Sequence, residues 1–422
     1  MQIETKQTGN RKRNHNRAYY LRGLLGLLSL LLLSSTAFGQ SAPPYEAPTR
    51  MVIKSEVLGE ERVVLVRTPF GYERNGQRYP VLYMTDGDAH IQHTSSTVEF
   101  LARNGRMPEM IIVGISNTDR GRDLTPTRAT ATRPDGKPLF PTSGGADKFL
   151  KFIETELMPA IEAKYRVQPY RMLAGHSLGG LFAIHTMMTR PELFNSYIAV
   201  SPSLQWDDQL LVKRAEQFFT NRKEFKKTLF FTLGNEQGGI AAGFKSFKEL
   251  LARYKPEGFV WEAVQLEDED HGSVVLRSHY LGMRKEFDGW QLPREATTGL
   301  VVGGVKGAEE HYRKLSQKLG YTLPVPEGLV NEIGYRLMNA GKIEEAIAAF
   351  KSNVERYPAS ANVYDSLAEA YERNDQLDLA RVNYEKAYTV GKESGSSNLE
   401  IFKTNLDRVS EKLKQKGSAT GK

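Results

Sequence analysis

The sequence has no cysteine among its 422 residues. This absence excludes a disulfide framework, a thiol nucleophile, a cysteine-ligated zinc or iron–sulfur site and a lipid-modified N-terminal cysteine. A general excess of basic charge is lacking as well. Residues 1–39 hold six basic residues and one acidic residue, so they account for +5 of the net charge of +7. The rest of the chain carries only +2, and nucleic-acid binding loses its main support.

The N-terminus has the pattern of an export signal. A basic stretch precedes an apolar run at residues 23–33, which is too short to span a bilayer comfortably. Small residues at Ala37 and Gly39 predict cleavage after Gly39. We therefore expect residues 1–39 to be a signal peptide and residues 40–50 a linker. The mature protein would be periplasmic or secreted, with no membrane span. The alternative is an uncleaved N-terminal anchor.

Residues 51–291 alternate short apolar runs with amphipathic stretches. Several runs are continuously apolar, as expected for strands that are covered on both faces. Strands that alternate with helices predict an α/β fold, here a mostly parallel sheet sandwiched between helices. Its functional loops would follow the carboxyl ends of the strands. The predicted strands are 51–57, 62–68, 80–85, 110–115, 172–175, 197–200, 229–233 and 259–265. The predicted helices are 93–103, 146–165, 178–189, 208–219, 242–253 and 273–287.

One connection, residues 116–145, is long and has no apolar period. A structureless loop of this length inside a compact domain is usually functional or disordered. Because it follows a strand end, we expect it to form a rim over the active site. The rim is modestly basic, and Arg122 is our candidate for a substrate contact. A basic rim suits an anionic or catechol-bearing substrate, although solvation alone also explains these charges.

The C-terminal part has a helical pattern that repeats every 34 residues, so that Phe350 recurs as Tyr384. In such a repeat, small residues let the two helices of a hairpin approach and large residues fill the gaps. Residues 327–394 thus resemble two tetratricopeptide repeats. Asp375 and Lys392 depart from the usual pattern in the second repeat.

A linker and a capping helix flank these repeats. The linker, residues 292–326, contains one predicted helix at 308–319, and the capping helix is predicted at residues 397–416. Two repeats bury little surface on their own. We therefore expect the segment to dock on the α/β domain of residues 51–291, on a second subunit as a homo-oligomer, or on a protein partner. We do not expect it to take part in bond breaking.

The strongest chemical signal is the segment Gly175-His176-Ser177-Leu178-Gly179. It has the G-x-S-x-G pattern between a short apolar strand and a helix, which is the context of a nucleophile elbow. Gly175 and Gly179 are needed because the serine backbone is strained and neighbouring Cβ atoms would clash. We expect Ser177 to be a nucleophile at the N-terminus of a helix. The alternative is a glycine-rich turn with an incidental serine.

A serine nucleophile needs a base, and the base needs an orienting carboxylate. His271 follows the last predicted strand and precedes the last helix, where an α/β-hydrolase carries its base. His185 and His279 are better explained as residues packed within helices. Glu236, just after the strand at 229–233, is the predicted acid, and Asp207 is the alternative.

An oxyanion hole requires two N–H groups directed at the developing alkoxide. The predicted donors are the backbone of Leu178 and that of Asp88, in the turn after the strand at 80–85. A metal at this turn, with His90 and His93, is the weaker interpretation, because this histidine spacing is no known ligand signature. No metal site is predicted.

With Ser177, Glu236 and His271 in hydrolase order, the chain resembles the Putative esterase family of α/β-hydrolases, which includes siderophore esterases, esterase D and feruloyl esterases. This resemblance implies hydrolysis of carboxylic esters of small molecules without a cofactor. Trp206 would line the acyl pocket or pack in the core. The segments that carry the resemblance are 81–88, 114–127, 175–187 and 201–206.

Two other functions fit the same sequence less well. Acyl transfer to a sugar or lipid acceptor uses the same fold and site in mycolyltransferase relatives. In a non-catalytic scaffold, the tetratricopeptide part would carry the function and the attached hydrolase domain would be inactive. The intact elbow and the position of His271 favour the esterase over the scaffold.

Overall fold

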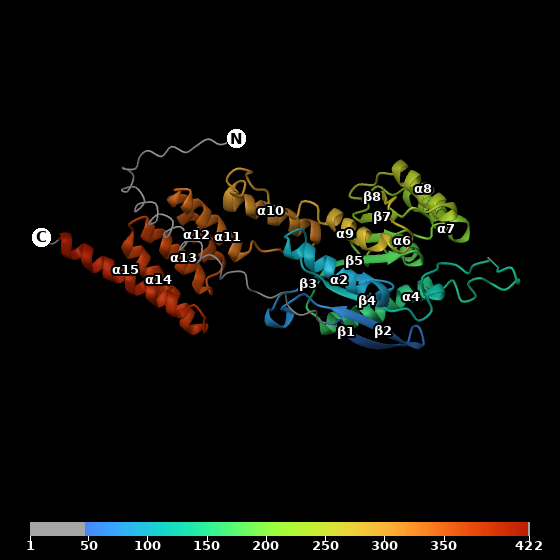
Figure 1. The fold of residues 1–422 in the computed structure, drawn as a ribbon, viewed down its shortest axis with the longest axis horizontal. Coiled ribbons are helices and arrows are strands. Elements are labelled where there is room, and N and C mark those ends of the chain that lie inside the picture. Colours follow the sequence, from blue (N-terminus) through green and yellow to red (C-terminus); the bar gives the residue numbers. More distant parts are fainter. Residues whose placement is uncertain (1–46, 131, 421–422) are drawn as a thin grey trace, which may run out of the picture. The chain divides into compact units, whose positions relative to one another are not determined.

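The computed structural model describes residues 47–130 and 132–420 (Figure 1). The predicted signal peptide and most of the linker after it lie outside these residues. The larger compact unit of the chain begins at Pro48 and contains all the elements described below. None of the helices in this described part of the chain combines the length and the hydropathy that a membrane span requires.

An eight-stranded sheet forms the core of the catalytic domain, in the order β1-β2-β4-β3-β5-β6-β7-β8. β1 and β2 pair antiparallel, as do β2 and β4, and every other pairing is parallel. This sheet confirms the predicted α/β fold class. The strands are β1 (Thr49–Ser55), β2 (Glu60–Arg67), β3 (Tyr79–Met84), β4 (Ile111–Ile115), β5 (Val167–His176), β6 (Ser196–Val200), β7 (Thr228–Leu233) and β8 (Val260–Gln265).

The central strands are apolar throughout because helices cover both faces of the sheet. In β3 the side chains alternate, so Val81 and Tyr83 enter one core cluster while Leu82 and Met84 enter the other. The first cluster includes residues of α4 to α8, and the second includes residues of α2 and α9. The helices are α2 (Gly87–Arg103), α3 (Arg120–Asp123), α4 (Ala146–Phe152), α5 (Met158–Lys164), α6 (Leu178–Thr189), α7 (Trp206–Thr220), α8 (Gly238–Arg253) and α9 (Val274–Glu286).

Helices α2 and α8 begin at least four residues earlier than the apolar period predicts. α2 begins at Gly87 and α8 at Gly238, because their first turns are polar or glycine-rich and carry no periodic signal. A π-helical turn, Ile153–Leu157, joins α4 and α5. The connection predicted to be structureless, residues 116–145, contains the short helix α3.

The C-terminal part is all-helical and fits a tetratricopeptide-like domain. Its first hairpin packs closely because Gly334 has no side chain: a Cβ there would lie 2.5 Å from the Phe350 ring. The equivalent Tyr384 is fully buried in the second hairpin. The helices are α10 (Gly304–Leu319), α11 (Glu327–Asn339), α12 (Ile343–Arg356), α13 (Ala361–Arg373), α14 (Leu377–Glu393) and α15 (Leu399–Thr420).

Helix α10 belongs to two cores at once. Near its end, Leu319 packs in the cluster of α2 and α9, and Lys318 bonds to the backbone of Glu286. Ala308, at the other end, packs with the helical repeats. The linker therefore supplies contacts to the catalytic domain.

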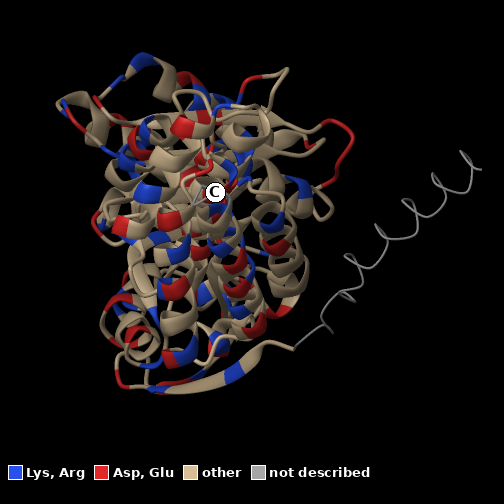
Figure 2. Ribbon diagram, turned by 90° about the vertical axis from the view of Figure 1, so that its left-hand side faces the viewer, with Lys and Arg blue, Asp and Glu red and all other residues tan. Residues whose placement is uncertain are grey.

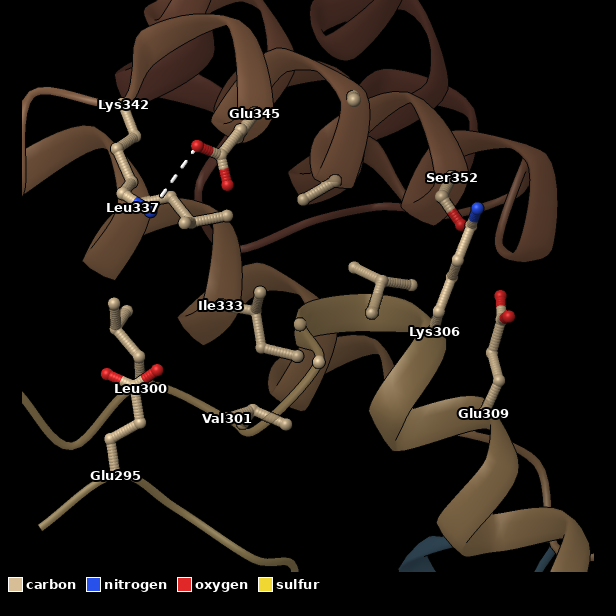
Figure 3. A pocket seen from close by; sticks show the side chains of 15 residues that line it. Glu295, Leu300, Val301, Lys306, Glu309, Ile333, Leu337, Lys342, Glu345 and Ser352 are labelled. Atoms are coloured by element: carbon tan, nitrogen blue, oxygen red, sulfur yellow. Dashed lines mark ion pairs between the residues drawn. The ribbon is translucent and has the colours of Figure 1, made fainter.

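A pocket of about 710 Å³ lies between this linker and the first hairpin (Figure 3). Val301 of the linker and Ile333 and Leu337 of α11 line its apolar side, and the ion pair between Lys342 and Glu345 lies at its edge. The residues that line it include none of those predicted to be catalytic. Basic and acidic residues are interspersed along the described elements (Figure 2), in keeping with the small net charge of the chain after residue 39.

Candidate active site

Ser177 occupies a strained turn between β5 and α6. Its backbone has φ 59° and ψ −113°, a conformation that residues with side chains rarely adopt. Both flanking glycines are required by close approach, of backbone to Gly175 and of a side chain to Gly179. A Cβ on Gly175 would lie 2.2 Å from the carbonyl oxygen of Gly179, and one on Gly179 would lie 2.2 Å from Thr85 Oγ1. The turn is therefore a nucleophile elbow, and it exposes the serine at the end of the sheet.

The structure brings Ser177, His271 and Glu236 together from three separate loops. His271 Nε2 lies 3.1 Å from Ser177 Oγ, and His271 Nδ1 lies 2.6 Å from Glu236 Oε1. Because the carboxylate accepts the proton on Nδ1, Nε2 of the neutral ring is an acceptor for the serine hydroxyl. This is the arrangement that nucleophilic catalysis by serine requires.

The second oxygen of the Glu236 carboxylate, Oε2, also accepts hydrogen bonds. Oε2 accepts hydrogen bonds from Ser201 Oγ at 2.5 Å and from the backbone N–H of Gly234 at 3.0 Å. The side chain of Glu236 is 8% exposed. Asp207, the alternative acid, instead accepts a hydrogen bond from Thr127 Oγ1 at 2.7 Å. Of the two predicted acids, Glu236 is the one that contacts His271.

His176 supports the loop that carries His271. Its Nε2 donates to the backbone carbonyl of His271 at 2.7 Å, and the two ring centroids are 4.6 Å apart. Burial, and then the neighbouring His271, lower the pKa of His176 to about 4. The ring is therefore neutral at pH 7 and keeps its proton on Nε2, where the carbonyl accepts it.

The predicted oxyanion donors lie at two helix N-termini. Asp88 is the second residue of α2, and Leu178 is the first residue of α6. The N–H groups of a first helical turn have no acceptor within the helix, and the helix dipole favours negative charge there. The two termini approach because Thr85, just before α2, contacts Gly179 in α6.

Arg120, which the sequence did not indicate as a functional residue, connects the start of α2 with the elbow. Arg120 bonds through Nε to Asp86 Oδ1 at 2.6 Å and through Nη2 to the carbonyl oxygen of His176 at 2.8 Å. Burial alone would raise the pKa of Asp86, but the hydrogen bonds from Arg120 hold it below its usual value. Asp86 is the N-cap residue of α2, so Arg120 fixes the start of α2 against the elbow.

Two residues predicted to line the substrate pocket have other contacts. The guanidinium of Arg122 bonds to Glu60 and Asp123, because Arg120 and Arg122 point to different sides of the short helix α3. Trp206 is buried, its ring packs on Phe140, and its Nε1 donates to Thr127 Oγ1 at 3.2 Å. The tryptophan thus packs against the long connection that follows β4.

Comparison with known proteins identifies the family of the chain. The model of the Putative esterase family matches residues 55–295, more than half of the chain. The chain belongs to this family. It is 31% identical over 236 residues to the ferri-bacillibactin esterase BesA of Bacillus subtilis, covering 50% of this chain and 80% of that protein.

Further relatives extend the comparison. The chain is 34% identical over 245 residues to a siderophore enterobactin esterase of Emericella nidulans, covering 48% of this chain and 80% of that protein. Among solved structures, it is similar to an IroE-like serine hydrolase from Shewanella oneidensis, with a TM-score of 0.64 and 27% identity. That similarity covers 74% of this chain and 99% of the other. The protein is a serine hydrolase that acts on ester bonds.

Proposed function

We propose that this protein is an exported esterase that cleaves a siderophore ester through an acyl-enzyme formed on Ser177. The observation that carries the proposal is the chain of contacts from Ser177 Oγ through His271 to Glu236, at 3.1 Å and 2.6 Å. One of its relatives is named a ferri-bacillibactin esterase and another a siderophore enterobactin esterase.

Acylation follows from the proton positions in this chain of contacts. His271 Nε2 takes the proton of Ser177 as Oγ attacks the ester carbonyl, and the carbonyl π electrons move onto oxygen. Glu236 stabilises the imidazolium through Nδ1–H. The backbone N–H groups of Leu178 and Asp88 bind the oxyanion. When the intermediate collapses, the alcohol leaves with the proton from His271 Nε2.

Deacylation repeats these steps with water. His271 removes a proton from a water molecule that attacks the acyl carbon, and then returns it to Ser177 Oγ as the acid departs. The three side chains and the two backbone donors account for every proton transfer and for the charge on the oxyanion. The reaction as proposed therefore requires no cofactor.

The choice of a siderophore is supported by the charge of the long connection after β4, besides the relatives. Arg128, Arg133 and Lys137 lie in this connection, against Asp135. Siderophores carry catecholate or other anionic oxygens, so the exposed basic groups of this connection would attract them.

A hydrolysis panel tests the proposed activity. It contains short p-nitrophenyl esters, a feruloyl ester, an acetylated sugar and a cyclic trilactone siderophore, each with the wild-type protein and Ser177→Ala. We expect Ser177-dependent release of acid, with the trilactone as the preferred substrate. Equal turnover by Ser177→Ala would contradict the mechanism. Preference for the feruloyl ester or the sugar, or acyl transfer when a carbohydrate acceptor is added, would contradict the substrate assignment or the reaction class.

Export has a separate test. The protein is expressed with its native N-terminus, and the mass of the material in each cell fraction is measured. We expect a mature chain that begins after Gly39 in the periplasmic or extracellular fraction. A full-length chain retained in the membrane would indicate an uncleaved anchor instead.

A further inference from the structure

A buried serine outside the triad contacts the nucleophile. Ser203 is 4% exposed, and its Oγ lies 3.2 Å from Ser177 Oγ. Among the residues that the structure describes, Ser177 Oγ is the one hydrogen-bond partner of this hydroxyl. Burying a hydroxyl costs free energy unless a partner satisfies it. The position of Ser203 is therefore tied to the reacting oxygen.

The backbone holds Ser203 in this position. Its N–H donates to the carbonyl oxygen of Ser177 at 3.1 Å, and its own carbonyl accepts from the N–H of Trp206 at 3.0 Å. Pro202 reaches the first turn of α6 because Gly180 has no side chain: a Cβ there would lie 3.0 Å from Pro202 Cα. The third glycine of the elbow segment thus makes room for the residue that precedes Ser203.

Counting protons decides which serine donates. His271 Nδ1–H is given to Glu236, so Nε2 is an acceptor and takes the one hydroxyl proton of Ser177. Ser177 then has no proton left for its contact with Ser203. The hydrogen of that contact must belong to Ser203, and Ser177 Oγ accepts it on a lone pair.

We propose that Ser203 is a catalytic residue, whose hydroxyl donates a hydrogen bond to Ser177 Oγ as this oxygen loses its proton. The proposal rests on the proposed function, because it assumes that Ser177 attacks and His271 accepts the proton. Ser203 keeps its own proton throughout. It stabilises the negative charge that develops on Ser177 Oγ before the new bond to carbon forms, and it directs the Ser177 proton to His271.

The neighbouring Ser201 has the corresponding contact at the other end of the triad. Its hydroxyl donates to Glu236 Oε2 at 2.5 Å, and it is fully buried with a left-handed φ of 37°. The segment Ser201-Pro202-Ser203 therefore places one hydroxyl on the acid and one on the nucleophile. This segment is part of residues 201–206, one of the stretches on which the resemblance to the family rests.

The test measures the rate at which a fluorophosphonate labels Ser177, because labelling is a single attack by Oγ. Ser203→Ala removes the donor, and Ser203→Cys keeps the shape of the side chain with a larger atom and a much weaker donor. We expect Ser203→Ala to slow labelling and kcat/KM for p-nitrophenyl acetate by about tenfold to a hundredfold, with Ser203→Cys slowed by about tenfold. Ser366→Ala, which deletes a buried hydroxyl of α13, should label at the wild-type rate.

The outcomes separate this proposal from the proposed function. Ser203→Cys that folds and labels at the wild-type rate would show that the residue only packs, and would overturn the proposal. This variant also decides the matter if Ser203→Ala does not fold. Retention of activity by Ser177→Ala would instead overturn the proposed function.

Discussion

The catalytic domain and the helical repeats both depend on glycine for close approach, but they use it against different neighbours. At the elbow, Gly175 faces the backbone of Gly179. In the first repeat, Gly334 faces the ring of Phe350. A backbone neighbour cannot turn aside, whereas an aromatic side chain can shift within its cluster. The first arrangement holds a reactive atom, and the second fills space.

The polar contacts of the two regions differ in the same way. In the catalytic domain, partly buried polar groups such as Glu236 and His176 form hydrogen bonds with His271. In the helical region, the buried carboxylate of Glu372 pairs with Arg408 and Lys412 and with the hydroxyl of Tyr384, which joins α13 to α14 and α15. Deleting a polar group should therefore cost activity in one region and stability in the other.

The largest expected effect follows from removing the base. His271→Ala should lower kcat/KM for p-nitrophenyl acetate by about 10⁴-fold, because no other group can take the proton of Ser177. His311→Gln, in the linker helix α10, serves as the control and should retain wild-type turnover. A loss of less than tenfold for His271→Ala would mean that another base serves Ser177.

The acids of the two regions provide the next contrast. Glu236→Gln should lower kcat by about 10²- to 10³-fold, since an amide cannot stabilise the imidazolium charge of His271. Glu372→Gln should leave kcat unchanged and lower the unfolding temperature, because Arg408 and Lys412 lose their partner. Both variants are compared by steady-state kinetics and thermal unfolding. A fall in unfolding temperature alone for Glu236→Gln would assign it a structural role.

Substitution of Gly175 and of Gly334 by alanine tests the difference between the elbow and the first repeat directly. Gly175→Ala should lower kcat/KM by about a hundredfold, because backbone next to Ser177 must move. Gly334→Ala should leave kcat/KM unchanged and cost about 1–3 kcal/mol of the free energy of unfolding by overpacking against Phe350. The measurements are kinetics and urea unfolding. Equal activity losses in both variants would remove the distinction between the two regions.

The smallest expected effect is on the pH dependence of stability. The pKa of His176 falls from its ordinary value of 6.5 to about 4 in the folded protein. The unfolded chain therefore binds the proton more readily, and stability is lost as the pH falls from about 6.5 towards 4. Between pH 7 and 5 the contribution of His176 to this loss should be on the order of 2 kcal/mol.

His176→Gln removes this titration and retains a donor for the carbonyl of His271. Its free energy of unfolding, measured in urea from pH 7 to 4.5, should fall less steeply than that of the wild type. Asp365 in the helical region is shifted in the opposite direction: burial raises its pKa. The free energy of unfolding of Asp365→Asn should therefore decline more steeply at low pH than that of the wild type. An unchanged slope for His176→Gln would contradict this assignment.

Much of the site could be predicted from the sequence, because its signals are local. The strand, glycines and helix around Ser177 lie within one segment, and His271 and Glu236 each follow a recognisable strand. The chain order of an α/β-hydrolase then brings them to one edge of the sheet. The 34-residue period similarly indicates helical hairpins without any knowledge of their packing.

The supporting residues could not be predicted, because their partners are distant in sequence. Ser203 and Ser177 are 26 residues apart, and Arg120 and His176 are 56 residues apart. No periodicity links such pairs. The contacts of Arg122 with Glu60 and Asp123 could not be predicted either, because composition does not show which side of a four-residue helix each arginine takes. The way in which α3 packs against the elbow determines the side that each arginine takes.

The central claim is that Ser177 is a nucleophile activated by His271 and Glu236. The most direct measurement is the mass of the protein and its peptides after reaction with a fluorophosphonate. The account predicts one adduct, on the peptide that contains Ser177, which is absent from Ser177→Ala and forms far more slowly in His271→Ala. A protein that forms no adduct, or an adduct that persists in Ser177→Ala, would contradict it.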